Sequence, residues 1–350
     1  MTGNNTEREA LRIGIVGAGA NTRDRHIPGL RAQAGVDIVA VANRTPASSQ
    51  RAAAELGIAR AAPDWRALVA DPDIDAVVIG TWPYLHCPVT LAALAAGKHV
   101  LCEARMAMNA EEAQRMLAAA RARPDRVAQL VPAPFTLGVD RCVQRLLREG
   151  FLGRLLAIEV RVADGHFADP AAPLNWRQDA EYSGLNVMTL GIWYECLMRW
   201  VGEAQGVMAL GRSCVAQRVD EHGRLRAVRV PDYLGVLATM ACGAQASFSV
   251  SAVSGLVRQG EILLCGSEGT LRFADGVLYG ARRGDDGLRP LEVRTDEAGG
   301  WRVEEEFVRA IRGLEAVSHT RFEDGLKYMQ FTQAVAQSMA ERREIALMPG

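Results

Sequence analysis

A glycine-rich turn at the end of an apolar segment constrains the fold of this chain more than any other feature. Residues 13–22 read Ile-Gly-Ile-Val-Gly-Ala-Gly-Ala-Asn-Thr, so Gly17 and Gly19 directly follow an apolar run. Glycines at this spacing let the backbone turn tightly from a strand into a helix, whose free N–H groups and dipole attract phosphate. We therefore predict a β–α–β unit that binds a dinucleotide, with a structural glycine turn as the alternative. Thr22 stands where the pattern has a third glycine, which predicts looser packing of helix on strand.

The residues around this turn alternate short apolar runs with helical patterns up to residue 131. The apolar runs are RIGIVG, VDIVAVAN, DAVVIGT, KHVLCE and RVAQLV. Strands that are apolar on both faces are typical of a parallel sheet covered by helices on both sides. Residues 1–131 are therefore expected to form an α/β domain with a doubly wound parallel sheet.

The pattern changes after the Pro132-Ala-Pro134 segment, which we interpret as the domain boundary. Residues 132–350 are expected to form an α+β domain with an open, mainly antiparallel sheet and helices on one face. The expected strands cover residues 155–164, 206–218, 227–242, 245–253, 261–266 and 269–273. The expected helices cover residues 138–149, 183–201, 303–312 and 322–342.

Charge and composition exclude several classes of partner. The chain has 40 Lys and Arg residues against 41 Asp and Glu residues, so a nucleic acid would meet no basic surface. The polar N-terminus, MTGNNTEREA, lacks the features of a secretory signal, and we expect a cytoplasmic protein. The longest uncharged stretch, residues 233–257, alternates like two strands, so we expect no membrane segment.

Neither the cysteines nor the histidines form a metal-binding pattern. The seven cysteines include no C-x-x-C pair, and buried free thiols are favoured over chemistry. The six histidines include no H-x-x-x-H pair, so we predict no metal.

The choice between NAD and NADP rests on Asn43-Arg44-Thr45, at the end of the second expected strand. An arginine there suits the 2′-phosphate of NADP, whereas a carboxylate would favour NAD. If Arg44 is only a solvated loop charge, NAD remains an alternative.

The chain resembles the glucose-fructose oxidoreductase and inositol dehydrogenase (Gfo/Idh/MocA) family. The resemblance rests on the glycine turn and on four segments in the same order, Gly-Thr-Trp-Pro-Tyr-Leu-His (80–86), Ala-Gly-Lys-His-Val-Leu-Cys-Glu (96–103), Asn-Trp-Arg (175–177) and Ser-Glu-Gly-Thr (267–270). It implies an N-terminal Rossmann domain, a bound nicotinamide cofactor and hydride transfer at a carbinol carbon of a sugar, polyol or related small molecule. It also implies a C-terminal α+β domain whose open sheet often forms a subunit interface, so we expect a homodimer or homotetramer.

The sequence departs from the family at the reacting centre. Family members typically have Glu-Lys-Pro where this chain has Glu103-Ala104-Arg105, so the catalytic lysine is missing. They also place an Asp and a His where this chain has Thr189 and Trp193. Because a positioned acid/base group is worth about a hundredfold to ten-thousandfold in rate, the ordinary proton relay is expected to be absent.

Three residues are candidate catalytic substitutes: Tyr194, Arg105 and His86, with Glu195 and Tyr84 as weaker candidates. Packing is the alternative role for Tyr194, and capping of the following helix is the alternative for His86. Trp176 and Arg177 match a family pair that approaches the cofactor, against a core tryptophan with a surface arginine. The predicted cofactor-binding residues are Gly17, Gly19, Ala20, Asn21, Asn43, Arg44, Thr81, Trp82, His86, Glu103, Trp176 and Arg177.

Three functions are compatible with these residues. The first is an NAD(P)-dependent oxidoreductase with an altered acid/base set, which would oxidise reduced cofactor in the presence of a suitable carbonyl compound. The second is a lyase or isomerase that retains the cofactor without net redox change. The third is a non-catalytic protein that binds NAD(P) without turning over any substrate.

Overall fold

The computed structural model describes residues 10–347, which divide into two compact units. The first unit contains the chain up to Ala107, then Glu111–Pro132 and Arg302–Leu326; the second contains Met108–Ala110, Ala133–Trp301 and the chain from Lys327 onward. Besides the expected change at residue 132, two further segments cross between the units, since Met108–Ala110 belong to the second unit and residues 302–326 return to the first. Residues 1–9, on which the expectation of a cytoplasmic protein mostly rests, lie outside the described part.

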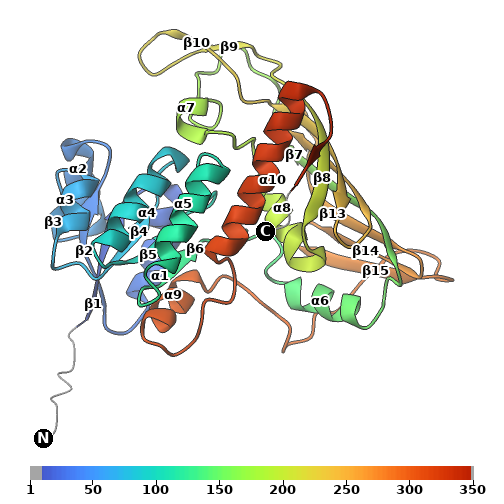
Figure 1. The fold of residues 1–350 in the computed structure, drawn as a ribbon, viewed down its shortest axis with the longest axis horizontal. Coiled ribbons are helices and arrows are strands. Elements are labelled where there is room, and N and C mark those ends of the chain that lie inside the picture. Colours follow the sequence, from blue (N-terminus) through green and yellow to red (C-terminus); the bar gives the residue numbers. More distant parts are fainter. Residues whose placement is uncertain (1–9, 348–350) are drawn as a thin grey trace, which may run out of the picture. The chain divides into compact units, whose positions relative to one another are not determined.

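A six-stranded parallel sheet forms the centre of the first unit, with the strand order β3-β2-β1-β4-β5-β6 (Figure 1). The strands are β1 (Leu11–Val16), β2 (Val36–Ala42), β3 (Arg60–Ala61), β4 (Ala76–Ile79), β5 (His99–Cys102) and β6 (Ala128–Leu130). The four residues of β4 are fully buried, as expected for a strand covered on both faces. This arrangement confirms the doubly wound parallel sheet.

The helices of the first unit follow the predicted alternation of strands and helices. They are the π-helical turn η1 (Thr22–His26), α1 (Ile27–Arg31), α2 (Pro46–Leu56), α3 (Trp65–Ala70), the 3-10 turn η2 (Pro83–Leu85), α4 (His86–Ala95), α5 (Ala110–Arg121) and α9 (Val303–Ile311). The side chains of Thr45 and Ser48 form a capping box at the start of α2, and Gly57 ends it with a φ of +61°. Strand β3 and helix α3 are not anticipated by the sequence patterns.

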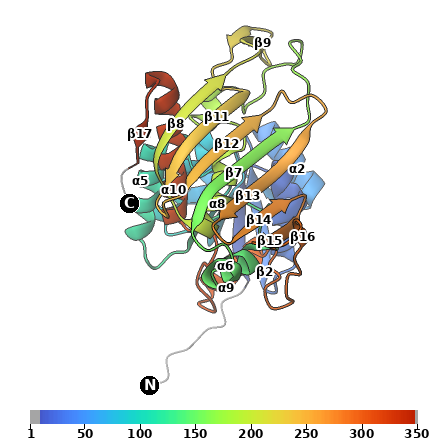
Figure 2. The ribbon, with the colours of Figure 1, turned by 90° about the vertical axis from the view of Figure 1, so that its right-hand side faces the viewer.

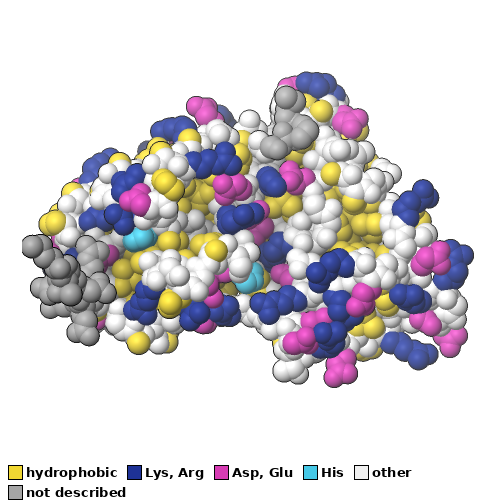
Figure 3. Space-filling model, turned by 60° about the horizontal axis from the view of Figure 1, so that its bottom comes forward, with side chains coloured by type: hydrophobic (Ala, Val, Ile, Leu, Met, Phe, Trp, Pro, Cys, Tyr) yellow, Lys and Arg dark blue, Asp and Glu magenta, His cyan; other side chains and the backbone are white. Residues whose placement is uncertain are grey.

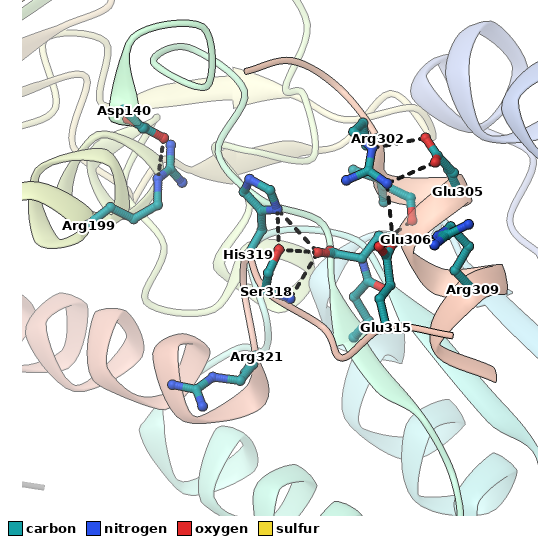
Figure 4. A network of polar contacts seen from close by, with 12 residues as sticks. Asp140, Arg199, Arg302, Glu305, Glu306, Arg309, Glu315, Ser318, His319 and Arg321 are labelled. Atoms are coloured by element: carbon teal, nitrogen blue, oxygen red, sulfur yellow. Dashed lines mark hydrogen bonds and ion pairs between the residues drawn. The ribbon is translucent and has the colours of Figure 1, made fainter. Parts of the chain in front are cut away.

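Buried polar contacts hold the returning segment in the first unit. The Nε2 atom of Gln129 donates to Glu306 at 3.0 Å, and the backbone N–H of Leu130 donates to the carbonyl of Thr320 at 3.1 Å. Glu306 also accepts from the backbone N–H of Ser318 at 2.9 Å, and His319 lies beside the same carboxylate (Figure 4). Burial would raise the pKa of Glu306, but the bonds from His319 and Ser318 lower it. The segment is therefore fixed at the β6 edge of the sheet.

A nine-stranded sheet dominates the second unit, with the order β16-β15-β14-β13-β7-β12-β11-β8-β17 (Figure 2). Only the pairing of β7 with β12 is parallel, so the sheet is mixed and mostly antiparallel. Its strands are β7 (Leu155–Asp164), β8 (Ala204–Arg212), β11 (Tyr233–Met240), β12 (Gln245–Ser251), β13 (Arg258–Gly266), β14 (Gly269–Ala274), β15 (Val277–Arg282), β16 (Arg289–Pro290) and β17 (Ile345–Ala346). A separate hairpin pairs β9 (Gln217–Val219) with β10 (Leu225–Ala227).

Two long expected strands, 206–218 and 227–242, are each interrupted. Strand β8 ends at Arg212, and the carboxylate of Asp232 accepts the backbone N–H of Cys214 at 2.8 Å in the following turn. Pro231, which has no N–H to donate to a ladder, precedes the start of β11. A side-chain bond and a proline thus divide segments whose apolar composition predicts continuous strands.

The second unit's helices are α6 (Asp140–Arg148), α7 (Ala180–Ser183), α8 (Leu190–Val201) and most of α10 (Phe322–Glu341). The expected helix 183–201 begins seven residues late, because Gly184 and Met188 have positive φ angles of 64° and 46°. Helices α8 and α10 pack on one face of the sheet, where the ring of Phe331 lies 5.5 Å from that of Phe248. These results confirm the expected open sheet with helices on one face.

The described surface matches a near-neutral protein. Lys and Arg side chains are interspersed with Asp and Glu side chains on the face drawn in Figure 3. Within residues 10–347, no helix combines the length and apolar composition needed to cross a bilayer. The same residues contain no cluster of three or more histidine, cysteine or acidic side chains suited to holding a metal ion.

Candidate functional site

The glycine turn follows β1 at the carboxyl edge of the parallel sheet. Gly17 has a φ of +89°, and a Cβ atom at this position would lie 2.7 Å from the Thr81 side chain and 2.8 Å from the backbone of Gly80. Only glycine therefore fits at position 17. Gly19 and Ala20 are exposed at the outside of the turn, where backbone N–H groups can approach a ligand.

Thr22, at the position of the third motif glycine, packs closely rather than loosely. Its side chain is 1% exposed, and its hydroxyl donates to the carbonyl of Gly17 at 3.1 Å. Gly80 makes room for it, because a Cβ atom on Gly80 would overlap the Thr22 hydroxyl. The predicted loosening of helix on strand is therefore wrong, since a glycine on the neighbouring strand end supplies the missing space.

A pocket of about 460 Å³ opens in front of the glycine turn, entirely within the first unit. It lies at the carboxyl ends of β1, β2 and β4, where the strand order reverses, which is where doubly wound sheets bind their ligands. Its lining residues are Val16, Gly17, Ala18, Gly19, Ala42, Asn43, Arg44, Ser48, Asp64, Trp65, Arg66, Gly80, Thr81, Trp82, Tyr84 and Leu85. Six predicted cofactor-binding residues are among them: Gly17, Gly19, Asn43, Arg44, Thr81 and Trp82.

Asn43 supports the glycine turn and the start of α2 with its side chain. Its Oδ1 atom accepts the N–H of Ala18 at 2.8 Å, and its Nδ2 atom donates to the carbonyl of Ser48 at 3.1 Å. The next residue, Arg44, is exposed, and its guanidinium carbon lies 5.7 Å from the centre of the Trp82 ring. The end of β2 thus brings a cation, and no carboxylate, to the pocket.

The pocket residues Asp64, Trp65 and Arg66 come from a segment in which no binding residue is predicted from the sequence. They lie at the start of α3, where Asp64 caps the helix by accepting the N–H of Ala67 at 2.9 Å. The two-residue strand β3 pairs with β2 and carries this segment to the pocket. An aspartate at the N-cap, here Asp64 after Pro63, is a sequence signal for the start of a helix and could have predicted α3.

Glu103, at the end of β5, belongs to a buried network beside the glycine turn. His26 is fully buried; its Nε2 lies 2.9 Å from Oε1 of Glu103, and its Nδ1 lies 2.5 Å from Oε1 of Glu304. Asn21 also donates to Glu103. Burial disfavours the imidazolium ion, but the bonds to the two carboxylates outweigh burial and raise the pKa of His26 to about 9. Asn21 and Glu103 therefore support the turn and do not line the pocket.

His86 is also fully buried, which argues against the predicted catalytic and cofactor-binding roles. Its Nδ1 atom lies 2.9 Å from the carbonyl oxygen of Arg105, and its Nε2 atom lies 2.9 Å from that of Thr81. Burial lowers the pKa of His86, so the neutral ring is favoured. The ring joins two loops of the first unit at the start of α4.

The Glu103-Ala104-Arg105 segment carries no exposed cation. Ala104 is half-buried, and its N–H donates to Oε2 of Glu103 at 3.1 Å. The Arg105 side chain is 4% exposed and does not line the pocket. This burial does not support the predicted catalytic role of Arg105, which stays a prediction.

Tyr194, a predicted catalytic residue, lies in the core of the second unit. Its ring stacks on Phe331 with centroids 3.7 Å apart, and its hydroxyl accepts the N–H of Ala204 at 2.8 Å. Burial raises the pKa of the phenol well above its usual range. Trp193 packs beside it on α8, stacked on Phe135 at 4.6 Å. Packing, the alternative role, accounts for both side chains.

Glu195, a weaker catalytic candidate, is buried and engaged in contacts that anchor the second unit. Both of its carboxylate oxygens accept the N–H of Ala133, at 3.2 and 3.1 Å, and Arg199 pairs with it at 2.8 Å. Arg199 also binds Asp140 at 2.8 Å, a contact drawn in Figure 4, and Asp140 accepts from the Trp200 indole at 2.6 Å. This buried cluster ties α6 and α8 to the start of the second unit.

Trp176 and Arg177 lie in the second unit, in the loop before α7. Trp176 is half-buried and Arg177 is exposed, with its guanidinium carbon 4.2 Å from the centre of the Trp176 ring. Their predicted role at the cofactor stays a prediction.

Comparison with known proteins matches both units. Residues 11–129 match the oxidoreductase family with the NAD-binding Rossmann fold, and residues 141–272 match the GFO/IDH/MocA C-terminal domain. Inositol 2-dehydrogenase of Acidothermus cellulolyticus is 29% identical, over 97% of this chain and 96% of that protein. Levoglucosan dehydrogenase of Pseudarthrobacter phenanthrenivorans is 32% identical, over 41% of this chain and 37% of that protein.

A solved structure has the same arrangement. The NAD-binding oxidoreductase from Klebsiella pneumoniae superimposes with a TM-score of 0.83 at 26% identity, covering 97% of this chain and all of that chain. With the six-stranded Rossmann sheet, the glycine turn and the mixed C-terminal sheet, the comparisons show that this chain belongs to the Gfo/Idh/MocA family of NAD(P)-binding oxidoreductases.

Proposed function

We propose that the protein is an oxidoreductase that prefers NADP and acts on a hydroxyl or carbonyl group of a small, sugar-like molecule. The observation that carries the cofactor preference is the end of β2, where Arg44 lines the pocket and Asn43 takes the place of a carboxylate. A guanidinium group forms strong bidentate bonds with a phosphate, whereas a carboxylate would repel it. The names of the relatives, inositol and levoglucosan dehydrogenases, support the substrate class.

The residues of the first unit fit a dinucleotide. The turn at Gly17 allows close backbone approach, and a pocket of about 460 Å³ lies in front of it. When bound, the cofactor would supply the hydride acceptor or donor. The chain's own part is to hold the diphosphate on the turn, to pair the ribose phosphate with Arg44 and to keep Glu103 ionised beside the turn through His26.

We further propose that the acid/base set differs from that of typical family members. Ala104, Thr189 and Trp193 offer no group that accepts a proton near neutral pH. Tyr194 and His86 are buried, and neither supports a replacement role. The Tyr194 hydroxyl accepts a backbone N–H, and the two His86 ring nitrogens face backbone carbonyls, of which a neutral ring can donate to one. We therefore expect slow turnover on simple sugars and polyols.

Two measurements test this proposal. Isothermal titration should show that NADPH binds more tightly than NADH, and that Arg44→Ala weakens NADPH binding by about 1.5–3 kcal/mol with little effect on NADH. Equal weakening of both cofactors would refute the NADP preference. Incubation of NADPH with a library of sugars and small carbonyl compounds should then reveal cofactor oxidation.

The missing acid/base groups also favour a second candidate, a protein that binds the cofactor without net redox chemistry. It would be either a lyase or isomerase that retains the cofactor, or a non-catalytic binding protein. Its specific support is Trp193, which the resemblance places at the position of the family's histidine and which is buried, with its ring stacked on the half-exposed ring of Phe135. Cofactor that co-purifies and keeps its redox state with every tested substrate would favour this candidate.

We also propose a homodimer or homotetramer assembled through the open sheet. The outer faces of β8 and β11 expose Met208, Leu210 and Leu237 at 53%, 76% and 50%. Leu237 lies opposite Met208 in the antiparallel register, so these side chains form a continuous apolar surface. A second copy of the same sheet would remove this surface from water.

A further inference from the structure

We infer that Arg66 is a second phosphate-binding cation and that, with Arg44, it forms a two-arginine site for the 2′-phosphate of the nucleotide. This inference rests on the proposed NADP preference and extends it to a residue outside the β2 loop. Both residues line the same pocket, although Arg66 lies in another helix and outside the cofactor-binding motif.

The pairing of β3 with β2 explains why Arg66 lies at the same pocket as Arg44. Ala40 and Val41 of β2 pair with Arg60 and Ala61 of β3, and the N–H of Ala62 donates to the carbonyl of Val41 at 2.9 Å. The chain after β3 therefore runs along the carboxyl end of β2, which leads directly to Arg44. Asp64 then starts α3, which puts Arg66 in the first turn of that helix.

The charged groups of the pocket favour an anion. Arg44, Arg66 and Asp64 are the charged side chains among its lining residues. One oxygen of Asp64 accepts the N–H of Ala67 as the helix cap, so this carboxylate is already engaged with the backbone. Two cations against one engaged anion leave the pocket with a positive excess, which suits a phosphate better than a ribose hydroxyl.

The orientation of Arg66 leaves its donors available. Its guanidinium carbon lies 4.4 Å from the centre of the Trp65 ring, and Arg66 forms no ion pair with any residue in the described part of the chain. A guanidinium group stacked on an aromatic ring keeps its N–H donors pointing outward in its own plane. With its guanidinium group over this ring and without an ion-pair partner in the described residues, Arg66 can bind a phosphate through its N–H donors.

A competing role for Arg66 would be to stack on the adenine ring. That role would help NADH and NADPH equally, because both contain adenine. A bond to the 2′-phosphate would help NADPH alone, which makes the two roles separable by measurement.

The test is isothermal titration of the full-length protein with NADPH and NADH, for the wild type, Arg66→Gln and Arg66→Lys. We expect Arg66→Gln to weaken NADPH binding about tenfold to a hundredfold, with NADH binding unchanged. Arg66→Lys should recover only part of the loss, because lysine keeps the charge but lacks the bidentate fork. Arg51→Gln, an exposed position on α2 that does not line the pocket, is the matched control and should change neither affinity.

The double variant Arg44→Ala/Arg66→Gln adds a second readout. If both arginines bind one phosphate, their effects on NADPH binding should be non-additive, as expected for groups that share a partner. Equal weakening of NADH and NADPH by Arg66→Gln, or no change in either, would overturn the inference. In either case an intact preference for NADPH would leave the proposed function standing, whereas failure of the wild type to bind any dinucleotide would refute the proposed function itself.

Discussion

The Nε2 atom of His26 lies 2.9 Å from Oε1 of Glu103, deep in the first unit, while the other ring nitrogen faces Glu304. A histidine between two carboxylates is stabilised as the imidazolium ion. Because the folded-state pKa of about 9 exceeds the ordinary value of 6.5, the charged form contributes stability at low and neutral pH. This pair links the stability of the cofactor-binding unit to pH.

We predict that the stabilisation from His26 is fully present below about pH 6.5 and is lost as the pH rises through about 9. The size of the loss is about 3 kcal/mol, as an order of magnitude. Urea unfolding at pH 7 and pH 10 should show a decrease that is much smaller in His26→Gln. His222→Gln, at an exposed histidine, should behave like the wild type. A wild-type stability that rises from pH 7 to pH 10 would contradict this assignment.

Gly17→Ala should abolish cofactor binding. Its φ of +89° and the 2.7 Å approach to Thr81 leave no room for a methyl group. The matched control is Gly276→Ala, whose φ is +79° but which has no atom within 4 Å of a built Cβ. Both variants should lose about 1–2 kcal/mol of stability from backbone strain, and Gly17→Ala should lose more because its methyl group also clashes. Only Gly17→Ala should lose NADPH affinity, measured by titration.

The buried ion cluster of the second unit predicts a large stability change. Arg199→Met would leave Asp140 and Glu195 buried without their shared cation, at a cost of about 3–5 kcal/mol. Arg141→Met, on the exposed side of α6, should change stability by less than about 0.5 kcal/mol. Denaturant unfolding of both variants measures the difference, and equal stabilities would show that the cluster contributes little.

Introducing the polar groups that the family resemblance implies at positions 104, 189 and 193 should raise alcohol oxidation. We expect the variant Ala104→Lys/Thr189→Asp/Trp193→His to oxidise inositol or glucose measurably faster than the wild type, because these groups can take the proton that leaves with the hydride. The set Ala104→Met/Thr189→Asn/Trp193→Gln controls for size without adding titratable groups. A wild-type kcat near the typical value of about 10 per second would show that the native residues already suffice.

The exposed sheet face predicts the assembly state. Leu237→Asp places a charge in the centre of the apolar surface formed with Met208 and Leu210. Light scattering should show a dimer or tetramer for the wild type and a smaller species for this variant. Val277→Asp, at a half-exposed position on β15, is the control. A monomeric wild type at micromolar concentration would exclude the proposed interface.

The sequence patterns predict the regular parts of the fold well, because long strands and helices repeat their apolar residues over many positions. Strand β3 has only two residues and α3 has six, so neither shows a period. Because β3 and α3 are not predicted, Arg66 is not predicted as a pocket residue either. Its position at the pocket depends on the pairing of β3 with β2. A sequence motif identifies residues at fixed spacing along the chain. Arg66 lies outside such a motif and lines the pocket because β3 pairs with β2 in the sheet.

The candidate catalytic residues show a second limit. Tyr194 and His86 are chosen as reactive types near motif positions, but their roles depend on burial, which a single sequence does not give. The stacking of Tyr194 on Phe331 joins α8 to α10, residues more than a hundred positions apart. The same limit applies to Glu195. Its contacts with Ala133 and Arg199 follow from the packing of the second unit, which the sequence does not give.

The fit of Thr22 against Gly80 shows that the space required by a tight turn is a property of a pair of residues. A comparison with the motif one position at a time finds that the glycine at position 22 is absent. The turn nevertheless packs closely on the end of β4, because Gly80 leaves room for the Thr22 side chain. Substituting Thr22 by glycine would therefore open a gap and would not repair a defect. Protein engineers who wish to graft this turn onto another sheet must transfer both positions together.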